Sequence, residues 1–306
     1  MIRMRTLLVS ALIGGATLPV IPLMGQSYSS GQPVWPAFEG WERNDDGSAN
    51  LVFGYMNENW QEELDVPIGP ENSLDPGGPD RGQPTHFQPR RNRFVFRVRV
   101  PKDWGEKELV WSLTTHGVAR KAYGSLRTDL VIENIDIMSE TGALGAGTSN
   151  PEIRGDKPPT IKLAGSPSVT ATVGKPVTLT AIVTDDGVPR PRGSGSGRGR
   201  GGEGGEFTPP SRITVGKNLG LHLSWFVYRG AGAAVTFDPR QIKTWEDTRE
   251  GANSPWAPRW IAPRLPPDGK YVVTATFDQP GTYVLRARAD DGALTSDEDV
   301  TVTVSR

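Results

Sequence analysis

The residue types best suited to chemistry in this chain are carboxylates gathered in short turns. Two Asp-Asp-Gly sequences occur, Asp185-Asp186-Gly187 and Asp290-Asp291-Gly292, and a third acidic run spans residues 297–299. Clustered carboxylate oxygens are the ligands that Ca²⁺ prefers, so Asp185, Asp186, Asp290 and Asp291 form a candidate calcium site. The alternative is that these residues only build turns, because Asp bonds to nearby backbone and Gly tolerates positive φ. No other cofactor is expected.

Three tryptophans in one irregular, proline-rich segment form a candidate sugar-binding surface. Trp245, Trp256 and Trp260 lie within residues 230–269. An indole ring offers a flat apolar face and an N–H donor, which suits stacking on a sugar ring. The alternative is that the three rings pin the segment onto a sheet.

The three histidines are scattered through the chain. His86, His116 and His222 show no His-x-x-x-His or His-Glu-x-x-His spacing, so the pattern does not favour a histidine metal site. His222 alternates with apolar positions and is expected to face solvent. His86 stands in a proline-rich loop at residues 69–91, which is either functional or held by its aromatic contacts. If the protein is an enzyme, this loop is the candidate location of its active site.

Arginines gather where this loop runs into a strand. They could form a basic stripe for an anionic polymer, or the outer face of a solvated sheet. The residues are Arg90, Arg91, Arg93, Arg97 and Arg99.

Several classes of site are excluded or disfavoured. The chain has no cysteine, which excludes disulfides, thiolate catalysis, a lipoprotein anchor and Cys-based zinc sites. No G-x-S-x-G serine motif occurs. Residues 197–202 fit G-x-G-x-x-G, but within a Gly/Arg-rich stretch where no strand and helix flank them. Basic and acidic residues number 34 and 35, so bulk charge predicts no nucleic-acid partner.

The first 25 residues have the pattern of an export signal. Arg3 and Arg5 precede an uncharged, largely apolar run over residues 6–23, and polar residues follow from Gly25. We predict cleavage near Gly25 and a periplasmic or extracellular location, with membrane contact only through the signal. The alternative is an uncleaved anchor.

A period of two, typical of half-buried strands, dominates the rest of the chain. In the hairpin at residues 280–304, Tyr283 and Leu285 fall on one face and Arg286 and Arg288 on the other. No stretch of the first half shows a sustained helical period. Strands are predicted at residues 51–56, 64–68, 93–100, 107–115, 126–132, 161–163, 169–173, 177–183, 221–228 and 270–277.

The second half resembles bacterial immunoglobulin-like domains of the PKD or cadherin-like kind. The resemblance covers residues 158–306 and rests on Gly-Lys-Pro-Val-Thr-Leu-Thr-Ala, a Trp-centred strand, Pro-Gly-Thr-Tyr-Val-Leu, Ala-Asp-Asp-Gly and Thr-Val-Thr-Val. It implies that Trp225 packs in the core and that Tyr283 occupies the tyrosine-corner position. The chain departs from the PKD pattern after Trp225, where residues 226–230 replace a Gly-Asp-Gly turn.

We therefore predict an all-β protein of two β-sandwich domains, the second immunoglobulin-like with long insertions. The expected boundaries are a signal peptide at 1–25, a first sandwich at 26–138, a linker at 139–159 and a second sandwich at 160–306. A disordered Gly/Arg-rich insertion is expected at about 187–216. The predicted function is a non-catalytic cell-envelope or extracellular binding or structural module, with a cell-surface protein or polysaccharide as partner. The alternative is a carbohydrate-active enzyme or carbohydrate-binding module.

Overall fold

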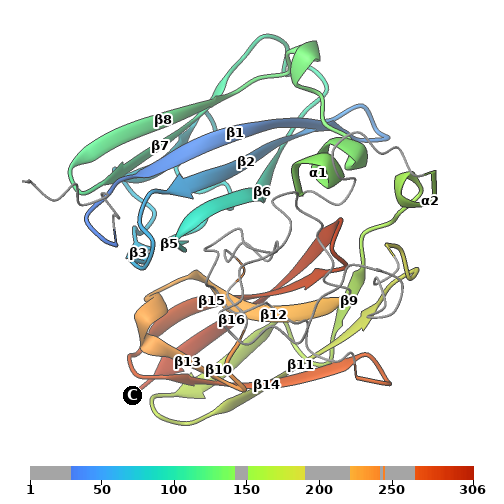
Figure 1. Cartoon of the computed structure of the whole chain (residues 1–306). Coiled ribbons are helices and arrows are strands. Elements are labelled where there is room, and N and C mark those ends of the chain that lie inside the picture. Colours follow the sequence, from blue (N-terminus) through green and yellow to red (C-terminus); the bar gives the residue numbers. More distant parts are fainter. Residues whose placement is uncertain (1–28, 142–150, 190–220, 242–243, 245–265) are drawn as a thin grey trace, which may run out of the picture.

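Alternating strands build two β-sandwiches that lie one against the other (Figure 1). The computed structural model describes residues 29–141, 151–189, 221–241, 244 and 266–306. The predicted signal peptide and most of the predicted disordered insertion lie outside these residues. No helix among the described residues is long and apolar enough to cross a membrane.

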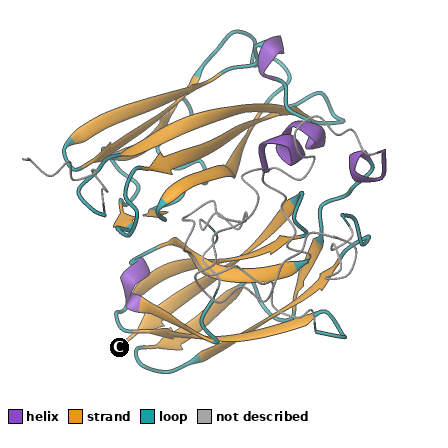
Figure 2. Ribbon diagram, in the orientation of Figure 1, coloured by secondary structure: helices purple, strands orange, loops and turns teal. Residues whose placement is uncertain are grey.

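The first sandwich consists of two three-stranded antiparallel sheets and a short ladder (Figure 2). The strand orders are β1-β2-β6 and β4-β7-β8, and β3 pairs with β5. The bounds are β1 Val34–Arg43, β2 Ala49–Asn57, β3 Leu64–Asp65, β4 Asn72–Asp75, β5 His86–Phe87, β6 Arg90–Val100, β7 Leu109–Thr115 and β8 Val118–Gly124.

An aromatic core fills the space between these sheets. The alternation along β7, within the strand predicted at residues 107–115, places Leu109, Trp111 and Leu113 inward, and all three are fully buried. The Trp111 ring meets Phe96 edge to face, with centroids 4.9 Å apart. Such pairs contribute about 0.5–1.5 kcal/mol beyond the apolar area they bury.

Two predictions for the first half were wrong. Strict alternation along the strand predicted at residues 93–100 would place Phe94 inward with Phe96, but Phe94 has a φ of 52° at an irregularity in the β2–β6 register. The irregularity turns Phe94 out of the core while Val95 is buried in it. The strand expected at residues 126–132 is instead a 3₁₀ helix, Thr128–Leu130, followed by an isolated bridge from Val131 to Trp41.

Two short helices lie between the sandwiches in the sequence. Helix α1, Asn134–Thr141, buries Ile137 and Met138, and α2 spans Pro151–Arg154. Period-two analysis did not predict them, because helices this short carry little periodic signal.

The second sandwich packs two four-stranded sheets with the orders β10-β16-β15-β12 and β13-β14-β11-β9. β10 runs parallel to β16, and the other neighbours are antiparallel. The bounds are β9 Thr160–Leu163, β10 Ser168–Thr172, β11 Val177–Thr184, β12 His222–Arg229, β13 Val235–Asp238, β14 Lys270–Phe277, β15 Gly281–Asp290 and β16 Thr295–Ser305.

Two side chains match the immunoglobulin-like pattern as predicted. Trp225, on β12, is 2% exposed in the core between the sheets. The Tyr283 hydroxyl donates to the carbonyl oxygen of Gln279, four residues earlier, at 2.9 Å. A tyrosine at the start of its strand that bonds back in this way is a tyrosine corner.

Candidate functional site at the interface of the two sandwiches

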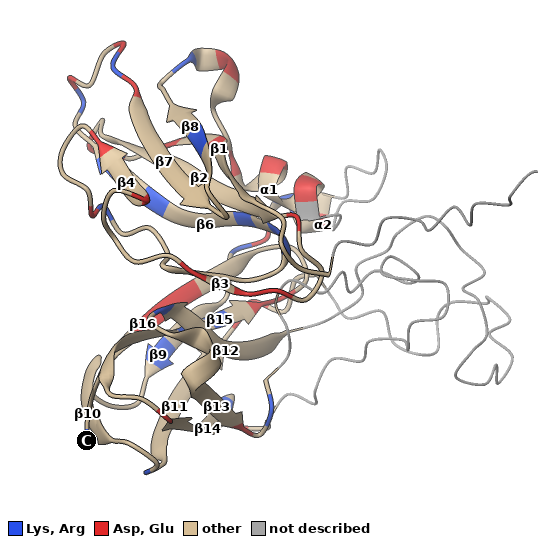
Figure 3. Cartoon of the chain, turned by 90° about the vertical axis from the view of Figure 1, so that its left-hand side faces the viewer, with Lys and Arg blue, Asp and Glu red and all other residues tan. Residues whose placement is uncertain are grey.

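Several ionisable groups with shifted pKa values lie where the sandwiches meet. The outer face of the sheet β10-β16-β15-β12 faces the loop at residues 76–91 and strand β6 (Figures 1 and 3). The backbone N–H of Thr85 donates to the carbonyl oxygen of Tyr228 at 3.2 Å, which joins β12 to that loop. The two sandwiches, which the sequence predicted as two domains joined by a linker, therefore contact each other directly.

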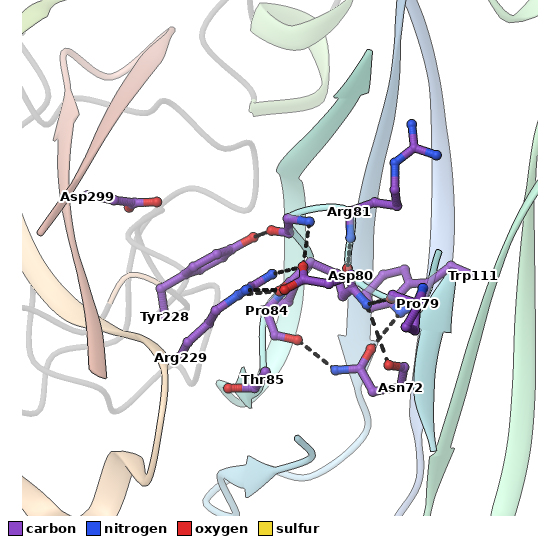
Figure 4. A network of polar contacts seen from close by, with 12 residues as sticks. Asn72, Pro79, Asp80, Arg81, Pro84, Thr85, Trp111, Tyr228, Arg229 and Asp299 are labelled. Atoms are coloured by element: carbon purple, nitrogen blue, oxygen red, sulfur yellow. Dashed lines mark hydrogen bonds and ion pairs between the residues drawn. The ribbon is translucent and has the colours of Figure 1, made fainter. Parts of the chain in front are cut away.

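Tyr228 and Arg229 connect β12 to the first sandwich (Figure 4). Tyr228 is buried in the first sandwich's own core, and its hydroxyl donates to the carbonyl oxygen of Gly82 at 2.6 Å. The Arg229 guanidinium donates to both carboxylate oxygens of Asp80, at 3.0 and 2.8 Å, and to the carbonyl oxygen of Gln83 at 2.8 Å. The hydrogen bond from Arg229 lowers the pKa of Asp80.

The loop that receives these residues is held from within. Asn72 is fully buried and donates to the carbonyl oxygens of Val66 and Pro84, at 2.9 and 2.8 Å. It accepts from the Trp111 indole N–H at 3.0 Å (Figure 4). Gln83 is also fully buried and donates to the carbonyl oxygen of Pro79 at 2.6 Å. The loop predicted to be functional or held by aromatics is thus held by buried amides and one tryptophan, and it carries part of the interface.

A second set of contacts comes from the outer face of β15. Arg286, 8% exposed, donates to the carbonyl oxygen of Val95 at 2.7 Å and to both oxygens of Asp299, at 2.7 and 2.9 Å. Arg288 donates to both oxygens of Asp297, each at 2.7 Å. Burial alone would raise the pKa of Asp297, but the neighbouring Arg288 outweighs burial and lowers it. The outward position of these arginines was predicted correctly, and their burial comes from the first sandwich.

His86, in the loop at residues 76–91, has a carboxylate partner on each ring nitrogen. Its Nδ1 lies 2.7 Å from Asp65 Oδ1, and its Nε2 lies 3.0 Å from Glu63 Oε2. Burial alone would lower the pKa of His86, but the hydrogen bonds to Asp65 and Glu63 prevail and raise it to about 9. The ring is therefore an imidazolium at neutral pH, with both nitrogens acting as donors, and has no free lone pair for general base catalysis.

The second sandwich closes over this histidine. The backbone N–H of Gly232 donates to Asp65 Oδ1 at 3.3 Å, and Gly232 sits against the imidazole ring. A cavity beside them, lined in part by Tyr55, His86 and Arg288, has a volume of about 10 Å³. That is about the space one water molecule needs, so this cavity does not accommodate a sugar or a similar substrate.

The carboxylates predicted to bind calcium lie at the ends of β11 and β15. One carboxylate oxygen of each Asp accepts a hydrogen bond from the backbone N–H two residues later. These bonds are typical of turns, so they support the alternative that the residues build turns. In each pair the Asp carboxylate accepts from the backbone N–H of the second residue: Asp185 from Gly187 at 2.8 Å, Asp186 from Val188 at 3.0 Å, Asp290 from Gly292 at 2.7 Å, and Asp291 from Ala293 at 2.6 Å.

A residue that sequence analysis missed joins this group. Asp156 follows α2, is 4% exposed, and neither of its carboxyl oxygens makes a hydrogen bond. Burial, together with the like charges of Asp291, Asp186 and Asp185, raises the pKa of Asp156 to about 7. Burial also raises the pKa of Asp291 to about 7, against two backbone hydrogen bonds that lower it. Within the described residues, no three His, Asp or Glu side chains are grouped so that they could hold a metal ion.

The other predicted sites have mixed outcomes. Trp245, Trp256 and Trp260 lie outside the described residues, so the sugar-binding surface remains a prediction. His222, expected to face solvent, is 6% exposed because its face of β12 is covered. The arginine stripe is largely neutralised by carboxylates. Arg91 pairs with Glu39, Arg93 with Glu140, Arg97 with Glu42 and Arg99 with Asp46, and Arg90 lies over the Trp60 ring.

Comparison with known proteins yields only distant structural likenesses. No family model and no curated protein match the sequence. A titin M10–obscurin-like 1 Ig complex is 14% identical, covers 49% of this chain and 95% of that chain, and gives a TM-score of 0.23. Domains 4 and 5 of the S-layer protein SbsC are 10% identical over 66% of each chain, with a TM-score of 0.23. The adhesin InvE of Yersinia pseudotuberculosis is 10% identical over 91% of this chain and 61% of that chain, with a TM-score of 0.22. At such TM-scores, the immunoglobulin-like assignment rests on strand order, Trp225 and Tyr283.

Proposed function

We propose that the chain is an exported, non-catalytic binding or structural protein of the cell envelope or exterior, in which the two sandwiches act as one unit. Its second domain would be an immunoglobulin-like module of the PKD or cadherin-like kind. The uncharged run at residues 6–23 behind Arg3 and Arg5 supports export. A cell-surface protein or polysaccharide is the proposed partner.

The observation that carries the non-catalytic proposal is the state of His86. An active site needs a group poised to exchange a proton, beside a space where substrate reaches it. His86 is instead buried, protonated and bound on both nitrogens, and Gly232 covers it. The neighbouring arginines and carboxylates are paired with one another or with backbone, and the contacts of Arg229 with Asp80 and of Arg286 with the Val95 carbonyl oxygen join the two sandwiches.

The catalytic alternative can be tested with the purified chain and a panel of polysaccharides and chromogenic glycosides. We expect no release of reducing sugar or chromophore from any of them. Turnover that disappears in His86→Ala but persists in His116→Ala, the matched histidine outside the interface, would contradict the proposal. Circular dichroism of both variants would establish that each is folded.

The export proposal can be tested by fusing bacterial alkaline phosphatase, which is active only outside the cytoplasm, to the C-terminus. We expect activity from the full chain and none from a fusion that lacks residues 1–25. Equal activity from both fusions, or none from either, would contradict export through this segment. Sedimentation of the purified chain with cell-wall polysaccharide would then test the partner class.

A further inference from the structure

One edge of the second sandwich is a strand with unpaired backbone groups. Strand β10 lies beside the C-terminus, at the edge of its sheet opposite to β12, which contacts the first sandwich (Figure 3). β10 runs parallel to β16. This ladder opens with the bond from the Thr301 N–H to the carbonyl oxygen of Pro167 at 2.8 Å. It closes with the bond from the Val173 N–H to the carbonyl oxygen of Ser305 at 2.9 Å. Odd-numbered residues therefore bond to β16, and even-numbered residues direct their backbone groups away from the sheet.

Turns at the two ends of β10 use only part of this outer edge. Ser168, Thr170 and Thr172 are exposed, and each has an N–H and a C=O on it. The Ser168 N–H donates to Ser166 Oγ at 3.1 Å, and the Thr172 carbonyl oxygen accepts from the Lys175 N–H at 3.0 Å. The Ser168 carbonyl oxygen, both groups of Thr170 and the Thr172 N–H have no hydrogen-bond partner in the described part of the chain. Such an edge is a template for another strand.

β10 lacks the charged side chains that protect other sheet edges. A charge on an edge strand opposes its pairing with a second chain. In the sheets of three or more strands that the described residues form, every other edge strand contains Lys, Arg, Asp or Glu. Examples are Lys121 on β8, Lys162 on β9 and Asp238 on β13, whereas β10 reads Ser-Val-Thr-Ala-Thr.

We propose that β10 pairs antiparallel with β10 of a second copy of this chain, about a two-fold axis at Thr170. In an antiparallel pair, residues at alternate positions exchange both backbone bonds with the residue opposite. Thr170 exchanges both bonds with Thr170 of the second copy, and the Thr172 N–H of each copy donates to the Ser168 carbonyl oxygen of the other. This register satisfies all the unpartnered groups of the edge. It joins the two four-stranded sheets into one through a self-complementary contact.

The side chains of β10 are compatible with this register. Thr170 lies opposite itself, Ser168 opposite Thr172, and Val169 opposite Ala171. Thr–Thr and Ser–Thr pairs across strands are favourable. Val169 and Ala171 are partly buried against the core of the second sandwich, so pairing removes more of their apolar surface from water. No Lys, Arg, Asp or Glu lies in the paired segment, so no charge meets its own copy.

The test is sedimentation equilibrium of the purified chain between about 10 μM and 1 mM. A pairing of five residues per copy is smaller than the roughly 1,200 Å² at which standard interfaces begin, so we expect a weak dimer with a Kd of about 0.1–1 mM. The weight-average mass should rise with concentration towards twice that of the chain. A chain that stays monomeric at about 1 mM would overturn the proposal and leave β10 for a strand of a different protein.

Two substitutions at the axis should abolish the rise in mass. Thr170→Lys places like charges opposite each other. Thr170→Pro removes the outward N–H but no bond to β16, a position where an edge strand tolerates proline. Thr303→Lys is the matched control, because Thr303 is exposed beside Thr170 on the same face but lies on β16, away from the edge. Circular dichroism would establish that each variant is folded. An equal rise in the Thr170 variants and in Thr303→Lys would overturn the assignment of β10.

A single introduced thiol reports the register, because the chain has no cysteine. Opposite residues of a hydrogen-bonded antiparallel pair have Cα atoms about 5.5 Å apart, within the reach of a disulfide. Oxidation should therefore link Thr170→Cys into a covalent dimer and leave Thr303→Cys monomeric. Equal cross-linking of the two variants, or none in either, would contradict the two-fold register.

Discussion

The guanidinium carbon of Arg286 lies 3.5 Å from the centroid of the Tyr228 ring. Both side chains leave the outer face of one sheet of the second sandwich, yet the Tyr228 ring belongs to the core of the first. Phe226 and Val284, from the same sheet, pack against that core as well. The apolar core of the first sandwich is therefore completed by the second, and a buried cation with its carboxylate partners borders it.

Removal of Arg286 should destabilise the protein strongly. In Arg286→Ala the buried carbonyl oxygen of Val95 loses its donor, and the carboxylate of Asp299, which is 39% exposed, loses its partner. An unpaired buried acceptor costs about 1–3 kcal/mol. Urea unfolding should show a loss of that order in the free energy of unfolding. Arg127→Ala, which breaks the exposed pair with Asp129, should cost less than about 1 kcal/mol. Similar losses in the two variants would contradict the burial argument.

The protonated state of His86 predicts a loss of stability at alkaline pH. Its pKa is raised to about 9 in the folded protein, against about 6.5 in an unfolded chain. The stabilisation is thus complete below pH 6.5 and is lost as pH rises through about 9. Unfolding free energies measured between pH 6 and 10 should fall by about 2–3 kcal/mol, a fall that His86→Gln should largely remove. His116→Gln should keep the fall, and an unchanged slope in His86→Gln would contradict the proposed cause.

Replacing Gly232 with a residue that has a Cβ should disturb the interface by a steric clash. A methyl group at this position would overlap the imidazole ring of His86, which Glu63 and Asp65 hold in place. Gly232→Ala should therefore cost about 1–3 kcal/mol, the usual range for overpacking. Gly69→Ala is the matched control, because nothing lies within 4 Å of its added methyl group. Small-angle scattering should detect a larger radius of gyration in Gly232→Ala if the sandwiches separate, whereas equal melting temperatures of the two variants would refute the contact.

The raised pKa of Asp291 predicts that folding stability depends on pH with the opposite sign to the dependence that an ordinary paired carboxylate produces. Its pKa is raised to about 7 in the folded protein, so without calcium the folded state loses stability as pH rises from about 4 through 7. In EGTA, Asp291→Asn should raise Tm at pH 8 and change it little at pH 5. The amide oxygen can still accept from the backbone N–H groups of Ala293 and Leu294. A lower Tm for Asp291→Asn at pH 8 in EGTA would show that the ionised carboxylate is favourable there.

Local pattern was sufficient for much of the second sandwich. The alternation of residues 283–289 and 300–304 predicted the central hairpin, and the residues around Trp225 and Tyr283 predicted their roles in the core and the tyrosine corner. These features depend on which face of a strand is apolar, and that information is contiguous in the chain. Helix α1 and the turned-out Phe94 were missed, because one is too short to show a period and the other depends on a backbone irregularity.

The candidate sites could not be predicted from local sequence, because they join residues from distant segments. The acidic residues Glu63 and Asp65 are evident in the sequence, but their pairing with His86 joins positions 23 and 21 residues apart. Asp156 stood alone among Pro, Gly and Lys residues, with nothing beside it to indicate a partner at Asp185 or Asp291. Both groupings arise from loops that meet only after the strands have paired.

The sequence by itself determined the all-β character of the chain, most of its strands and the inward face of most of those, because a period of two is visible within a single contiguous segment. The tertiary structure decided which outward faces stay in water. Arg286 and Tyr228 occupy outward positions on their strands, but the first sandwich covers them, and burial with partners from a distant segment set their interactions. Solvation and charge pairing depend on neighbours in space, so the state of His86, Asp156 and Asp291 follows from the way the two sandwiches and the segment between them pack together.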